Sequence, residues 1–161
     1  MSTGHADYSL VTGRDKNKAR RGSCLFAESM TREPLQILAV EDEKAVAQLL
    51  AVVLGGPTAK VTRAADGWEA LIKIAAAPKP YDVVITDHRM PRMSGLELVR
   101  RLRKRKFAGK ILVLSAHLCD EDIRAYEALN VDMMMSKPFD FEEIQTAVAI
   151  LTKGASVAAA A

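Results

Sequence analysis

The sequence has few cysteines and no long apolar run. Its only two cysteines, Cys24 and Cys119, lie far apart without a CxxC spacing, so neither a disulfide framework nor a paired thiolate motif is indicated. No stretch resembles a signal peptide, and none is long and apolar enough to span a bilayer. These absences predict a cytoplasmic protein with free thiols and no membrane partner.

The chain also lacks a marked excess of charge of either sign. Its 23 basic and 20 acidic residues give a net charge of +3, which by itself predicts neither nucleic acid nor membrane as a partner. One local exception is the run RRLRKRK at 100–106, which reads either as a solvated helix C-terminus or as a contact surface for an anion. It has no interleaved aromatic residue and no DNA-binding motif, so nucleic acid is the less favoured partner.

The 161 residues fit one domain with short tails. Residues 1–33 show no periodicity and carry a basic cluster, which predicts a disordered arm. Residues 34–153 are the predicted folded domain, and the Ala-rich residues 154–161 are a predicted flexible tail. We therefore expect a stand-alone domain without an attached output domain.

Within the predicted domain, a strand followed by a helix occurs five times. The predicted strands are 35–40, 59–64, 83–87, 110–115 and 131–136. The helices between and after them show apolar residues at helical spacing and include capping boxes at Asp66–Glu69 and Ser94–Glu97, an amphipathic run containing Trp68 and Ile72, and a last helix that begins near Phe141. This alternation predicts an α/β fold, a doubly wound parallel sheet whose ligand lies beyond the carboxyl ends of the strands.

The residues that follow these strands form one candidate site. Glu41 and Asp42 follow the first strand, Asp87 ends the third, Ser115 ends the fourth and Lys137 follows the fifth. Crowded carboxylates repel one another, and a hard cation such as Mg²⁺ would relieve that repulsion. The ammonium and hydroxyl groups suit the oxygens of a transferring phosphoryl group, and a carboxylate can act as its acceptor. Asp87 is therefore the candidate phosphoryl acceptor.

With these residues in place, the chain resembles the receiver domains of two-component response regulators. The resemblance covers about residues 34–152 and rests on AVEDE, VVITDHRMPRMSGLEL, VLSA and MSKPF in the expected order and spacing. It implies a flavodoxin-like, five-stranded sheet of order 2-1-3-4-5 with five helices, similar to that of chemotaxis regulators. It also implies that a histidine kinase or phosphotransfer protein supplies the phosphoryl group, and that a downstream protein responds.

The resemblance further implies a role for each site residue. Asp87 would be the phosphoacceptor and, with Asp42 and the backbone carbonyl of Arg89, a direct Mg²⁺ ligand, whereas Glu41 would act through water. Glu41 departs from the usual pair of aspartates, but its longer side chain suits this outer position.

Three further residues would respond to the phosphoryl group. The resemblance implies that Ser115 senses it, that Lys137 pairs with it, and that the Lys137–Pro138 bond is cis. Met134 occupies the switch position, where the family usually has an aromatic residue.

The positions two residues beyond Asp87 and two beyond Ser115 flank the approach of hydrolytic water in receivers. Here they are Arg89 and His117, both bulky, and we expect them to prolong the lifetime of the phosphorylated state. Apart from this tuning role, the three histidines show no metal spacing, and His5, His88 and His117 are expected at the surface.

Two other functions remain open at this stage. An aspartate-nucleophile phosphatase would also form an aspartyl phosphate, but such enzymes usually carry a second Asp two residues after the nucleophile, where this chain has Arg89. A phosphorylation-independent scaffold is the other alternative, favoured if Met134 uncouples the site from the surface. The leading prediction is a phosphorylation-dependent protein-interaction switch or phosphorelay intermediate that is not a turnover enzyme.

Overall fold

The computed structural model describes residues 33–153 of the chain. The arm predicted for residues 1–33 falls outside this range except for its last residue, and the tail predicted for 154–161 falls wholly outside it. Both stay predictions.

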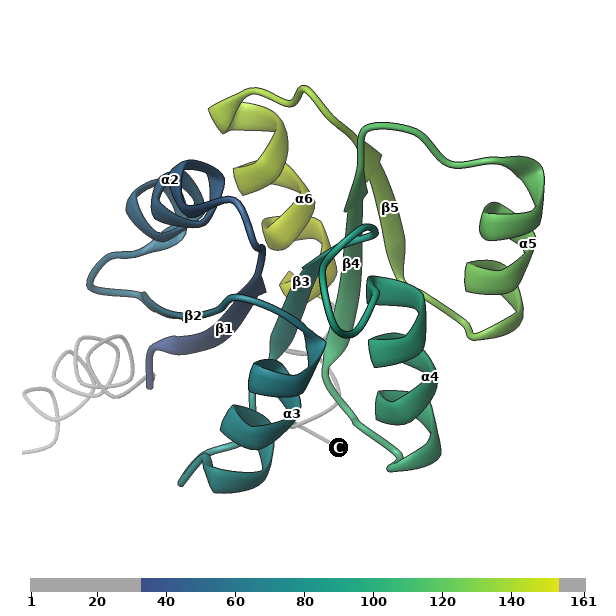
Figure 1. Cartoon of the computed structure of the whole chain (residues 1–161). Coiled ribbons are helices and arrows are strands. Elements are labelled where there is room, and N and C mark those ends of the chain that lie inside the picture. The colour runs from purple at the N-terminus through teal and green to yellow at the C-terminus, as the bar shows by residue number, and fades with distance from the viewer. Residues whose placement is uncertain (1–32, 154–161) are drawn as a thin grey trace, which may run out of the picture. The chain divides into compact units, whose positions relative to one another are not determined.

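A five-stranded parallel sheet forms the centre of the described domain (Figure 1). Its strands lie in the order β2-β1-β3-β4-β5, and every neighbouring pair is parallel. The strands are β1 (Leu35–Val40), β2 (Ala59–Ala64), β3 (Val83–Asp87), β4 (Lys110–Ser115) and β5 (Met133–Ser136). The order and direction confirm the predicted flavodoxin-like fold, and β5 begins two residues later than the sequence predicted.

Five helices connect and cover these strands. They are α2 (Lys44–Leu54), α3 (Gly67–Ala76), α4 (Gly95–Lys104), α5 (Asp120–Ala128) and α6 (Phe141–Lys153). Helices α2 and α6 pack on one face of the sheet, and α3, α4 and α5 pack on the other (Figure 1). No helix within residues 33–153 combines the length and the apolar character needed to cross a membrane.

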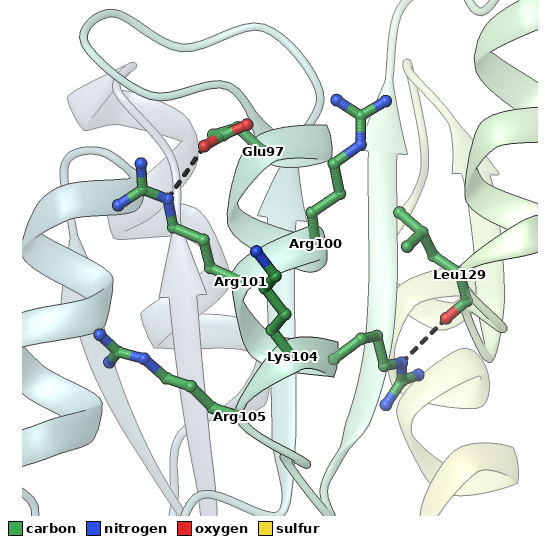
Figure 2. Close-up of a pocket in the computed structure, with 7 residues that line it drawn as sticks. Glu97, Arg100, Arg101, Lys104, Arg105 and Leu129 are labelled. Carbon is green, nitrogen blue, oxygen red and sulfur yellow. Dashed lines mark hydrogen bonds and ion pairs between the residues drawn. The ribbon is translucent and has the colours of Figure 1, made fainter.

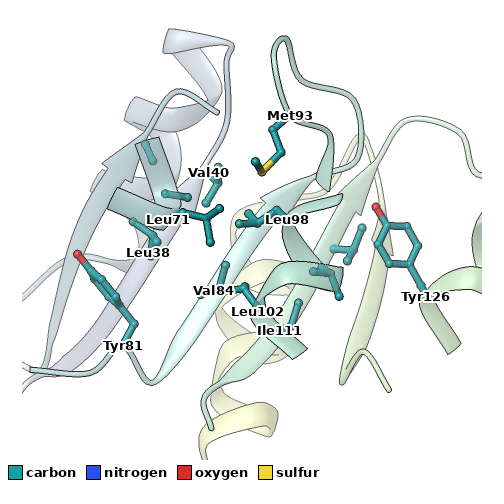
Figure 3. Packing of buried hydrophobic residues seen from close by; sticks show 14 residues of the cluster. Leu38, Val40, Leu71, Tyr81, Val84, Met93, Leu98, Leu102, Ile111 and Tyr126 are labelled. Carbon is teal, nitrogen blue, oxygen red and sulfur yellow. The ribbon is translucent and has the colours of Figure 1, made fainter. Parts of the chain in front are cut away.

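The strands divide their side chains between two apolar clusters because successive residues of a strand point to opposite faces. Leu38, Val84 and Val113 join the cluster under α3, α4 and α5, part of which is shown in Figure 3. Ile85 and Leu112 join the cluster under α2 and α6. All five residues of β3 are buried, as expected for the central strand of a sheet covered on both faces.

The two predicted capping boxes form to different extents. Asp66 accepts hydrogen bonds from the backbone of Trp68 and Glu69 at 2.8 and 3.0 Å, and Glu69 reaches back to the amide of Ala65 at 2.8 Å. At α4, Ser94 accepts from the amide of Glu97 at 3.3 Å. The Glu97 carboxylate instead accepts from Arg101 at 2.9 Å, one turn along the helix, so only the Ser94 half of that box is present.

Three apolar residues assigned to helix faces are more exposed than their periodicity suggested. Trp68, Ile72 and Phe141 are 47%, 64% and 56% exposed. The guanidinium of Arg101 covers the Trp68 ring, 4.8 Å from its centroid, which partly shields it from water. The buried face of α3 consists of the small residues Gly67 and Ala70 with Leu71.

Gly95 sets how closely α4 approaches the end of β3. A Cβ atom at this position would overlap the backbone carbonyl oxygen of Asp87, so a residue without a side chain is needed here. The Gly95 amide donates to the carbonyl of His88 at 3.0 Å. The start of α4 is thereby held directly against the backbone of the predicted phosphoacceptor.

Candidate functional site at the carboxyl edge of the sheet

The third strand presents Asp87 at the edge of the sheet, as the sequence predicted. Its side chain is nearly buried, with the residue 8% exposed. One carboxylate oxygen lies 2.8 Å from Nζ of Lys137, and the other accepts from the backbone amide of Arg89 at 2.9 Å. Asp87 is therefore held from both sides by residues that follow different strands.

Lys137 joins two of the acidic residues. Besides Asp87, its ammonium pairs with Glu41 at 2.6 Å. Burial works against the charge on Lys137, but its bonds to Asp87 and Glu41 outweigh that effect and raise its pKa, so it stays protonated. Burial raises the pKa of Glu41, which the Lys137 bond offsets only in part. The longer side chain of Glu41 thus meets the ammonium in this structure.

Asp42 completes the acidic cluster. One oxygen from each of Glu41, Asp42 and Asp87 lies within 4.8 Å of the others. Asp42 is exposed while the other two are buried, so the cluster opens to solvent on the Asp42 side. Three carboxylates with one ammonium leave an excess of negative charge, and oxygen ligands of this kind suit Mg²⁺.

Ser115 lies at the same edge, with its hydroxyl turned toward the loop that leads to α5. The hydroxyl donates to the carbonyl of His117 at 2.9 Å and accepts from the amide of His117 at 3.2 Å. The Ser115 carbonyl accepts from the backbone amide of Lys137 at 2.8 Å, which ties the ends of β4 and β5 together. The Lys137–Pro138 bond is cis, as the family resemblance implied.

Met134 packs as a partly buried residue against the cluster under α3, α4 and α5. Its neighbours Met133 and Met135 pack on the opposite face of the sheet, where they too are only partly buried. Met134 therefore places a flexible thioether side chain, and not an aromatic ring, at the switch position.

The expectation of a surface position was wrong for His88. Its residue is 8% exposed, and its Nδ1 atom lies 2.8 Å from the hydroxyl oxygen of Tyr126. Burial raises the pKa of Tyr126, which keeps that hydroxyl protonated and able to donate. Nε2 of His88 lies 3.4 Å from a carboxylate oxygen of Asp122. Two signals pointed to this contact: His88 directly follows a buried strand, and Tyr126 is the single aromatic residue of a polar helix.

The side chains of His117 and Arg89 are exposed, and their backbone amides bond to Ser115 and Asp87. Their effect on the lifetime of the phosphorylated state stays a prediction. His5 lies outside the described residues.

Some residues of the basic run at the end of α4 bind to other parts of the domain (Figure 2). Arg103 donates to the carbonyls of Leu129 and Asn130 at 3.0 and 2.6 Å and pairs with Asp132 at 3.1 Å. Arg101 bonds to Glu97. The exposed side chains of Arg100, Lys104 and Arg105 line a shallow groove beside Leu129.

The parallel sheet carries acidic residues at the ends of its first and third strands and a lysine after its fifth. This combination defines a class of signalling domain. The family model of the response regulator receiver domain matches residues 37–149. The chain belongs to this family.

Individual relatives agree with this assignment. The chain is 34% identical over 124 residues to the alkaline phosphatase synthesis transcriptional regulatory protein PhoP of Bacillus subtilis, a match that covers 77% of this chain and 51% of PhoP. It is 32% identical over 118 residues to the two-component response regulator ORR41 of Oryza sativa subsp. japonica, covering 71% of this chain and 92% of ORR41. The chain thus spans about half the length of a transcriptional regulator that it matches.

Among solved structures, the described fold is similar to the chemotaxis protein CheY4 of Vibrio cholerae. The TM-score is 0.68 at 30% sequence identity, and the match covers 74% of this chain and 99% of CheY4.

Proposed function

We propose that Asp87 accepts a phosphoryl group from a histidine kinase or phosphotransfer protein, and that the domain then acts as a phosphorylation-dependent interaction switch or a phosphorelay intermediate. The position of Asp87 is the observation that supports this most directly. Its carboxylate lies 2.8 Å from the ammonium of Lys137 and within the acidic cluster at the ligand edge of the sheet. We place this reaction in the cytoplasm and its output in a contact with a downstream protein.

In the proposed transfer, a carboxylate oxygen of Asp87 attacks the phosphorus atom of a phosphohistidine. The new O–P bond forms as the P–N bond breaks, and the electron pair stays on the donor imidazole nitrogen, which takes up a proton. Lys137 offers positive charge to the phosphoryl oxygens. Ser115 would turn its hydroxyl from the His117 carbonyl to donate to one of these oxygens.

The donor atoms at this edge fit a magnesium ion. In the proposal, Asp42, Asp87 and the backbone carbonyl of Arg89 are direct ligands, and Glu41 contributes through water. When bound, Mg²⁺ neutralises charge on the transferring phosphoryl group. The existing Lys137–Glu41 pair keeps Glu41 occupied, which is consistent with an outer position for that carboxylate.

We propose that the domain assists its own phosphorylation and is not a turnover enzyme. An aspartate-nucleophile phosphatase would need an acid/base group two residues after Asp87, and that position is Arg89. A phosphorylation-independent scaffold is the second candidate, because Met134 stands where the family usually has an aromatic switch residue. In a scaffold, Asp87→Asn would leave partner binding unchanged.

The test is phosphorylation by acetyl phosphate with Mg²⁺, followed by intact-protein mass spectrometry. We expect one added phosphoryl group on the parent chain and none on Asp87→Asn. Asp82→Asn is the matched control, because Asp82 precedes the other end of the same strand and should leave the modification intact. Equal modification of Asp87→Asn and the parent would contradict the assignment of the acceptor.

A further inference from the structure

His88 connects the proposed phosphoacceptor to helix α5 through its side chain. Its backbone is fixed on two sides, since its amide donates to Leu114 at 2.9 Å and its carbonyl accepts from Gly95 at 3.0 Å. The imidazole extends to α5, where it meets the hydroxyl of Tyr126 at 2.8 Å and the carboxylate of Asp122 at 3.4 Å. A neutral ring with its proton on Nε2 accepts from the Tyr126 hydroxyl at Nδ1 and turns its N–H toward Asp122.

The contacts of His88 with Asp122 and Tyr126 hold α5 at two points along its length. Asp122 and Tyr126 are four residues apart and therefore lie on one side of the helix, one turn from each other. Asp122 also accepts from the amide and the thiol of Cys119 at 3.4 and 3.1 Å, so the carboxylate that meets His88 also holds the first turn of α5. A displacement of the imidazole thus acts on both the start and the middle of the helix.

Helix α5 buries little of its own surface, and its other fixed point is its C-terminal end, where Arg103 donates to the carbonyl of Leu129. Tyr126 is its only buried residue, fully enclosed in the apolar cluster (Figure 3). Elements with few buried apolar contacts open and shift at the lowest free-energy cost. The Tyr126 ring also meets the His88 ring edge-on, with centroids 5.7 Å apart.

Phosphorylation would change the groups that hold the backbone at His88. One oxygen of Asp87 accepts from the amide of Arg89, and the other pairs with Lys137. A phosphoryl group on that carboxylate adds charge and three acceptor oxygens, which compete for both donors. His88 lies between the acceptor residue and Arg89, so a rearrangement of this segment moves the imidazole.

We propose that His88 transmits the phosphorylation state of Asp87 to helix α5 through Tyr126 and Asp122, and that Met134 is not the main coupling residue. The inference rests on the proposed function. His88 and Tyr126 are positioning residues here, since neither touches the reacting atoms.

Hydrogen exchange of the α5 amides tests the inference, measured with Mg²⁺ in the presence and absence of acetyl phosphate. In the parent we expect phosphorylation to change their exchange rates about fivefold or more, a modest allosteric coupling. Tyr126→Phe keeps the buried ring and should accept the phosphoryl group, but it should lose most of that change. His88→Phe, which removes both polar contacts, should behave in the same way. Met134→Leu is the matched control and should keep the parental response.

Mass spectrometry of the same samples separates the possible failures. A parent chain that gains no phosphoryl group contradicts the proposed function and this inference together. A phosphorylated parent without an exchange change in α5 contradicts the inference alone. So does a phosphorylated Tyr126→Phe chain with the parental change, or a Met134→Leu chain that has lost it.

Discussion

The charged clusters at the two edges of the sheet differ in how fully their charges are paired. At the carboxyl edge, Glu41, Asp42 and Asp87 share the single ammonium of Lys137. At the amino edge, the one carboxylate of Asp132 meets two cations.

In the amino-edge cluster, three donors bind the carboxylate of Asp132. Asp132 pairs with Lys110 and Arg103 at 3.0 and 3.1 Å and accepts from the amide of Ile111 at 2.9 Å. Arg103 also donates to the carbonyls of Leu129 and Asn130, at the turn between α5 and β5, and to the carbonyl of Phe107. In this cluster the one carboxylate is matched by two cations, whereas the carboxyl edge keeps negative charge that a cation can neutralise.

The largest expected effect is the gain in stability when Mg²⁺ binds at the carboxyl edge. Mg²⁺ should stabilise the folded chain, because it relieves repulsion among three carboxylates. A ligand that binds only the folded state contributes about 2.7 kcal/mol at a hundredfold excess over its Kd. Asp42→Ala should remove most of this gain, measured as the shift of the thermal midpoint on adding Mg²⁺. Glu121→Ala, an exposed carboxylate outside the cluster, should keep it. An undiminished shift in Asp42→Ala would rule out Asp42 as a ligand.

The next largest effect is a loss of stability at the amino edge. Arg103→Ala should lower the free energy of unfolding by about 1–3 kcal/mol, because the carbonyls of Leu129 and Asn130 lose a donor and the Asp132 carboxylate loses one of its three. Lys104→Ala, the exposed neighbour on the same helix, should change it by no more than about 0.5 kcal/mol. Urea unfolding of both variants measures the difference. Equal stability of the two variants would show that the Arg103 contacts do not hold the turn.

The amino edge should also respond to acid. Burial alone would raise the pKa of Asp132, but the bonds from Ile111, Lys110 and Arg103 lower it below its ordinary value of 3.8. A depressed pKa adds stability that is complete above the unfolded value, near pH 4, and is lost as the pH falls through the folded value. Asp132→Asn should therefore flatten this part of the stability profile, measured by urea unfolding from pH 6 to pH 2.5. A parental acid slope in the variant would contradict the assignment.

The smallest effect concerns the lifetime of the phosphorylated state. Arg89→Ala and His117→Ala should each speed loss of the phosphoryl group by less than about tenfold, which is 1.36 kcal/mol of barrier. Both side chains are exposed, and from their positions two residues beyond Asp87 and Ser115 we expect them to hinder the approach of water. The decay is followed after removal of the phosphodonor, and Mg²⁺ affinity should stay nearly unchanged. Decay at or below the parental rate in both variants would show that these side chains do not shield the bond.

Sequence reasoning located the carboxyl edge because a simple rule applies there. Parallel strands bring their carboxyl ends to one edge, so Asp87 and Lys137, fifty residues apart, were expected to meet, and they lie 2.8 Å apart. The Asp66 cap followed from an equally local signal, whereas the strand order was implied by the resemblance to receiver domains.

The amino-edge cluster and the His88 contact were not found in this way. Arg103 lies in a basic run that reads as a solvated helix end, yet its partners are 26 to 29 residues away on a turn. His88 meets Tyr126 38 residues later. No periodic pattern specifies such contacts, because they depend on how α4 and α5 pack together. Glu97 shows the converse, since its spacing fits a capping box but a nearby arginine competes for its carboxylate.

Helix α5 also bears on how the surface of this domain can change over evolutionary time. Only Tyr126 among its nine residues is buried, and Asp122 is engaged with His88 and Cys119. Substitutions at the remaining exposed positions cost the fold little. A lineage could therefore change the surface of this helix by successive replacements while Asp87 and the sheet beneath it stay unchanged.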